Sequence, residues 1–66
     1  MSVLKVIEVL AESNKSWEDA AQNAVSEASK SLKNIRSVNV NNQSCVVVKS
    51  KITSYRINAK ITFEVE

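Results

Sequence analysis

The chain has 66 residues, a formal net charge of +2 at pH 7, and no glycine, proline or histidine. Without glycine it cannot form the glycine-rich loops that bind phosphates, and without histidine it lacks the commonest general base, so the composition argues against an enzyme. A charge of +2 does not by itself indicate a nucleic-acid or membrane partner.

A domain of this size is expected to need stabilisation beyond its own core. It buries only about 60% of the surface that its unfolded chain exposes. The single Cys45 cannot form an internal disulfide, and without histidine a zinc site has too few nitrogen or sulfur ligands. Self-association is the remaining source of additional stability, and we therefore expect a homo-oligomer.

The N-terminal sequence MSVLKVIEVL predicts a strand from Val3 to about Leu10, followed by a polar turn over residues 11–15. Lys5 and Glu8 interrupt its apolar part, unlike a signal peptide, and no apolar run is long enough to span a membrane, so we expect a cytoplasmic protein. The apolar residues of this strand fall on both faces, although a sheet covered by one helix needs one apolar face. The second face is expected to contact another subunit.

A helix is predicted from Ser16 to about Lys33. Ser16 is a suitable N-cap, Asp19 can reach back to it, and Lys30 and Lys33 suit the negative end of the helix dipole. One face is apolar and mostly alanine, which lets a helix approach a sheet closely and favours a sheet curved around it. That face comprises Trp17, Ala20, Ala21, Ala24, Val25, Ala28, Leu32 and Ile35.

Two further strands follow the helix. Asn34 is expected to be a left-handed cap. The second strand begins near Ile35 and continues to Val48, with a bulge rather than a turn over residues 41–44. Residues 49–53 are predicted to turn the chain, and the third strand, residues 54–65, alternates strictly between apolar and polar side chains. The predicted fold is α+β with β-α-β-β order, the third strand lying between the other two and antiparallel to both.

The segments KVIEVL, SWEDAAQNAVSEAS, NIRSVNV and YRINAKITFEVE resemble the dodecin family across the whole chain. This resemblance implies a single domain over residues 1–66, with a three-stranded antiparallel sheet wrapped around one helix. It also implies assembly as a homododecamer, a hollow twelve-subunit shell with threefold and twofold contacts. Members of the family typically bind flavins such as FMN or riboflavin.

The family's flavin pocket depends on a tryptophan near the start of the second strand and a glutamine just after the tyrosine of the third. The matching positions here hold Ser37 and Arg56. Serine cannot stack on the flavin ring, and a guanidinium has donors only, so we predict weak flavin binding or none. The segments IR at Ile35–Arg36 and YRI at Tyr55–Ile57 resemble the branch called calcium dodecins.

No calcium ligands can be assigned from the sequence. The acidic residues do not form a ligand loop of known spacing, so a calcium ion would need oxygens from several subunits. These residues are Glu8, Glu12, Glu18, Asp19, Glu27, Glu64 and Glu66.

Several side chains have two interpretations. Trp17 is interpreted as a core residue rather than a ligand-stacking ring, and Cys45 as a small buried hydrophobe rather than a redox thiol. Arg36 and Arg56 either form an anion site or pair with Glu64 or with another subunit's carboxylate. The lysines of the polar surface are interpreted as solvated rather than bound to nucleic acid. They are Lys49, Lys51 and Lys60.

The leading hypothesis is therefore a non-enzymatic shell that binds or stores a small ligand. A metal-binding shell with calcium, a purely structural assembly and a small nucleic-acid-binding module are the alternatives.

Overall fold

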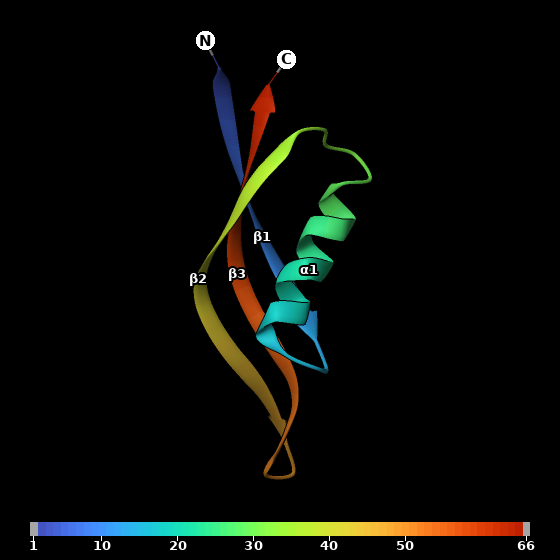
Figure 1. The fold of residues 1–66 in the computed structure, drawn as a ribbon. Coiled ribbons are helices and arrows are strands. Elements are labelled where there is room, and N and C mark those ends of the chain that lie inside the picture. Colours follow the sequence, from blue (N-terminus) through green and yellow to red (C-terminus); the bar gives the residue numbers. More distant parts are fainter. Residues whose placement is uncertain (1, 66) are drawn as a thin grey trace.

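The structure is a computed structural model that describes residues 2–65. This part of the chain forms one helix and a three-stranded antiparallel sheet (Figure 1). The elements follow the order β1 (Val3–Ser13), α1 (Trp17–Ala28), β2 (Ile35–Val48) and β3 (Lys51–Val65). Strand β3 lies between β1 and β2 and runs antiparallel to both. The predicted α+β class, element order and strand arrangement are confirmed.

The start of α1 is fixed by short polar contacts. The Ser16 side chain accepts a hydrogen bond of 3.0 Å from the Asp19 backbone N–H, which confirms the predicted N-cap. Instead of reaching back to Ser16, the Asp19 carboxylate accepts a hydrogen bond of 2.6 Å from the buried Ser13 hydroxyl. The cap therefore also ties the helix to the end of β1.

Helix α1 ends at Ala28, earlier than the predicted Lys33. The Ser29 hydroxyl donates to the Val25 carbonyl at 2.7 Å, and the next two backbone N–H groups bond three residues back, to Glu27 and Ala28. Serine side chains compete in this way with regular helical bonds, and three-residue spacing marks a tightened last turn. Lys30 and Lys33 therefore follow the helix rather than ending it, and Ile35 belongs to β2.

The strands are longer than their sequence pattern indicated. Strand β1 continues to Ser13 rather than ending near Leu10. The predicted turn over residues 49–53 is wrong, because Val48 pairs with Lys51 and only two residues connect the strands. These two residues, Lys49 and Ser50, have φ values of 51° and 64°, as the tight turn of a twisted hairpin requires.

Two predictions about irregular backbone are confirmed. Asn34 has a φ of 61°, the expected left-handed conformation, and leads directly into β2. The register between β2 and β3 shifts between Val40 and Asn42, so the polar stretch that follows is a bulged part of one continuous strand.

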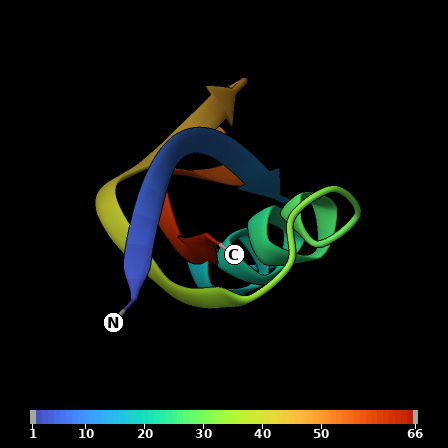
Figure 2. The same cartoon turned by 90° about the horizontal axis from the view of Figure 1, so that it is seen from above.

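The core joins the alanine face of α1 to the middle of β3. Ala20 and Ala24 of the helix are buried, as are Ile57, Ala59 and Ile61 of the strand. Small helix side chains allow this close approach, and the strongly twisted sheet curls partly around α1 (Figure 2). The expectation of a sheet curved around an alanine face is confirmed.

The opposite side of β1 carries exposed apolar side chains. Leu4, Val6 and Leu10 alternate with the helix-facing residues and are 55%, 52% and 78% exposed. This agrees with the prediction that β1 is apolar on both faces, and it leaves one face uncovered in a single chain. No helix within residues 2–65 is long and apolar enough to cross a membrane.

Candidate functional site

The face of the sheet turned away from α1, here called the outer face, carries the polar residues of β3. These alternate with the buried Ile57, Ala59 and Ile61, and all except Glu64 are paired with residues of both neighbouring strands. Arg56 lies between Glu12 of β1 and Ser44 of β2. The outer-face residues of β3 are Arg56, Asn58, Lys60, Thr62 and Glu64.

Arg56 forms an ion pair with Glu12, the residue directly opposite it on β1. The distance from Arg56 Nε to Glu12 Oε1 is 2.5 Å, and the two side chains are 60% and 50% exposed. Solvent screens a pair this exposed, so it contributes about 1 kcal/mol or less to stability. Its importance here is geometric, because it holds a guanidinium and a carboxylate side by side.

A hollow of about 560 Å³ surrounds this ion pair. Leu10 supplies an exposed apolar side chain, while Ser44 and Asn58 add a hydroxyl and an amide. The volume is within the usual range for small-molecule sites, and the hollow offers hydrogen-bond donors and acceptors beside an apolar surface. It is therefore the candidate ligand site within a single chain.

Ser37, the second residue at a family flavin position, lies far from Arg56. It pairs with Thr62, six residues along β3 from Arg56, which corresponds to about 20 Å at about 3.3 Å per residue. Both residues are exposed. One chain therefore does not bring Ser37 and Arg56 together, and a pocket that contains both requires more than one chain.

Arg36 is engaged by a carboxylate at the other end of the outer face. Its Nη2 and Nε lie 2.7 and 3.1 Å from Glu64 Oε1, and the Ser2 hydroxyl donates to Glu64 Oε2 at 3.3 Å. The hydrogen bonds from Arg36, together with its positive charge, lower the pKa of Glu64 below its usual value, and the Ser2 hydroxyl adds a smaller effect in the same direction. The predicted pairing with Glu64 is confirmed for Arg36, whereas the partner of Arg56 is Glu12.

Trp17 is a packing residue, as predicted. Its ring contacts the core and meets Tyr55 edge to face, with ring centroids 5.2 Å apart. Its indole N–H donates to the Ser44 carbonyl at 3.2 Å, which satisfies the polar group.

Cys45 is only partly buried, so the expectation of a buried hydrophobe was too strong. The three lysines interpreted as solvated are all exposed, in agreement with that interpretation.

Most acidic side chains on the described part of the chain have a partner. Asp19 accepts from Ser13, and Glu27, Glu12 and Glu64 pair with Lys30, Arg56 and Arg36. No group of three or more potential metal-binding side chains occurs among residues 2–65. Glu66, counted among the acidic residues of the sequence, lies outside the described residues.

Glu12, Leu10 and Ser44 were not identified as site residues from the sequence. Glu12 was assigned to a polar turn because the first strand was ended near Leu10. The two-residue spacing of Glu8, Leu10 and Glu12 could have indicated a longer strand that places all three on one face, with the two carboxylates opposite Lys60 and Arg56.

Comparison with known proteins identifies the fold and its family. The family model for dodecins matches residues 3–66. The chain belongs to the dodecin family. It is 39% identical over 64 residues to the calcium dodecin of Mycobacterium tuberculosis, an alignment that covers 97% of this chain and 90% of that dodecin.

Solved dodecin structures have the same backbone. The dodecin of Streptomyces coelicolor has a TM-score of 0.93 at 23% identity, covering 98% of this chain and 93% of the other, which supports the fold alone. The M. tuberculosis calcium dodecin has a TM-score of 0.84 at 39% identity, and the match covers 98% of this chain and 93% of the other. That protein is described as a calcium-chelating antigen with a novel calcium-binding site. The resemblance found in the sequence is confirmed.

The Arg36–Glu64 pair predicts a measurable pH effect. A carboxyl whose pKa is lower in the folded protein stabilises that protein above its usual pKa, and the contribution is lost as the pH falls through the folded value. In Arg36→Gln, the pKa of Glu64 should rise toward its usual value. At neutral pH the free energy of unfolding of this variant should be slightly lower than that of wild type, and the difference should disappear in acid.

An NMR titration of the Glu64 side-chain carbon, with urea unfolding over the same pH range, measures both quantities. Lys30→Gln is the matched control, because it breaks the exposed pair with Glu27 and leaves the Glu64 titration unchanged. An unaltered Glu64 pKa in Arg36→Gln would contradict the assignment.

Proposed function

We propose that this dodecin is a non-enzymatic homododecameric shell that binds or stores a small ligand in sites formed between subunits, with residues 1–66 acting as one domain. The observation that carries the proposal is the uncovered apolar side of β1, where Leu4, Val6 and Leu10 are more than half exposed. A chain with one cysteine and no histidine gains stability most directly by covering this surface with copies of itself.

The separation of Ser37 from Arg56 supports sites between subunits. Both residues lie on the outer face, yet about 20 Å of β3 separates them within one chain. A shell places several copies of the outer face near one another, so that Ser37 of one copy can approach Arg56 of another. The hollow around Arg56 would then be one wall of a larger pocket.

Flavin is an unfavourable ligand for such a pocket. Ser37 offers no ring for stacking, and Arg56 is already bonded to Glu12. Calcium is the second candidate, because the 39% identical relative is named a calcium dodecin. Calcium prefers several oxygen ligands, which in this chain would come from the carboxylates of more than one subunit.

Native mass spectrometry of the protein purified from its own host tests assembly and bound ligand together. A twelve-subunit shell has a mass of about 88 kDa, twelve times the 7.3 kDa of one chain. We expect this species to carry bound ions or a small molecule other than a flavin, with calcium lost after treatment with a chelator. A monomer or dimer at all concentrations contradicts the proposal, and a stoichiometric flavin contradicts our interpretation of Ser37 and Arg56.

Restoring the family residues should restore flavin binding. We expect Ser37→Trp with Arg56→Gln to quench riboflavin fluorescence at micromolar protein, because stacking is worth roughly 1 kcal/mol or more beyond the buried area. Wild type should leave the fluorescence unchanged.

The matched control is Asn39→Trp with Arg56→Gln, which moves the tryptophan two residues along the same face of β2. Equal quenching by wild type, or equal quenching by the control and the restored variant, would contradict the inference that Ser37 and Arg56 weaken flavin binding.

A further inference from the structure

The hairpin formed by residues 46–54, here called the arm, extends beyond the rest of the fold. Strand β1 ends where Ser13 pairs with Tyr55, so the arm has two strands and no third (Figure 1). Val47 and Ile52 are directly paired and 60% and 57% exposed, and Val48 beside them is 50% exposed. A two-stranded hairpin with such a surface is marginally stable in water and prone to association.

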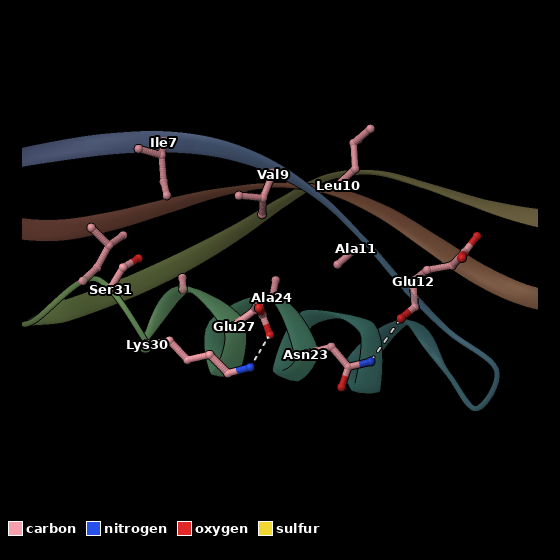
Figure 3. A pocket seen from close by; sticks show the side chains of 12 residues that line it. Ile7, Val9, Leu10, Ala11, Glu12, Asn23, Ala24, Glu27, Lys30 and Ser31 are labelled. Carbon is pink, nitrogen blue, oxygen red and sulfur yellow. Dashed lines mark hydrogen bonds and ion pairs between the residues drawn. The ribbon is translucent and has the colours of Figure 1, made fainter.

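A groove that also exposes apolar side chains lies between α1 and β1 and is here called the α1–β1 groove. It has a volume of about 670 Å³, and Ile7 and Val9 of β1 face Ala24 of the helix across it (Figure 3). The groove stays open because the helix presents alanines and ends at Ala28. Leu32 continues the apolar lining beyond the helix end.

Among the residues that line the groove, two are acidic and one is basic, whereas the charged residues of the arm are all basic. Glu12 and Glu27 lie at the rim, and each already has one cationic partner, Arg56 for Glu12 and Lys30 for Glu27. Both carboxylates are at least half exposed and therefore remain accessible to a further lysine. The arm contains Lys49 and Lys51 and has no acidic residue. Charge complementarity of this kind selects the orientation of two surfaces and speeds their association.

The arm cannot reach the groove of its own chain. It extends past the start of α1, whereas the groove lies along the later half of the helix and the segment that follows (Figure 1). We propose that the arm of one subunit docks in the α1–β1 groove of a neighbouring subunit. The inference rests on the proposed self-assembly and names the two surfaces that meet.

A contact between two different surfaces has a consequence for assembly. Each copy offers one arm and one groove, so the contact repeats head to tail and closes into a ring when the rotation between copies allows it. Val47 and Ile52, which share one face of the arm, are then buried against Ile7, Val9 and Leu32 of the neighbour, whereas Val48 lies on the opposite face.

Cross-linking between engineered cysteines tests the contact. In a Cys45→Ser background, Ile52→Cys marks the arm and Ser31→Cys marks the groove, where Ser31 is exposed. A short bismaleimide should join subunits covalently, several-fold more than in the control with Ile52→Cys and Ser26→Cys. Ser26 is also an exposed serine and does not line the groove.

The outcomes separate this inference from the proposed function. Equal cross-linking in both variants, in a protein that still has the shell mass, overturns the arm contact and leaves the shell intact. A wild-type chain that stays monomeric removes both proposals.

A second pair of variants does not depend on cysteine chemistry. Ile52→Asp should abolish the shell mass in native mass spectrometry, whereas Ile52→Val, which keeps the apolar surface, should retain it. Shell formation by Ile52→Asp at wild-type protein concentration also overturns the contact, as does a small apolar molecule found bound in the groove of the assembled protein.

Discussion

The contact between a short alanine-faced helix and the middle strand of a long sheet determines the rest of this structure. Ala20 and Ala24 lie against Ile57 and Ala59, where small side chains on both elements allow close approach. The helix has 12 residues and a length of about 18 Å, whereas the 15 residues of β3 extend about 50 Å. A single helix therefore covers less than half of one face of the sheet.

The surfaces left uncovered are the physical basis of the proposed self-assembly. The outer side of β1, the arm and the α1–β1 groove each expose apolar side chains that α1 does not cover. The same geometry separates Ser37 from Arg56, so that a pocket containing both residues requires more than one chain. In the proposed shell, assembly and ligand binding are two consequences of one constraint, since covering the sheet also brings Ser37 and Arg56 of different copies near one another.

The sequence predicted those features that depend on side-chain periodicity and on capping. The alternation in β3, the N-cap Ser16 and the left-handed Asn34 each have a local cause that is visible in the residues themselves. The end of α1 could not be predicted, because the Ser29 hydroxyl competes with the helix through a contact that periodicity does not reveal. The tight turn was missed because neither Lys49 nor Ser50 is a usual left-handed residue. Of the residues around the candidate hollow, Arg56 was singled out in the sequence, whereas Glu12 was missed because its pairing depends on where β1 ends. Ser37, the other predicted position, lies outside the hollow.

The central claim is that the fold is completed by other copies of the chain, and urea unfolding over a hundredfold range of protein concentration tests it most directly. Stability that depends on assembly changes with protein concentration, because subunits associate only when folded, and association therefore shifts the unfolding equilibrium toward the folded state. The account predicts that the unfolding midpoint rises with concentration and that loss of the assembled mass coincides with loss of β-structure. A midpoint independent of concentration, in a chain that sediments as a monomer throughout, would contradict it.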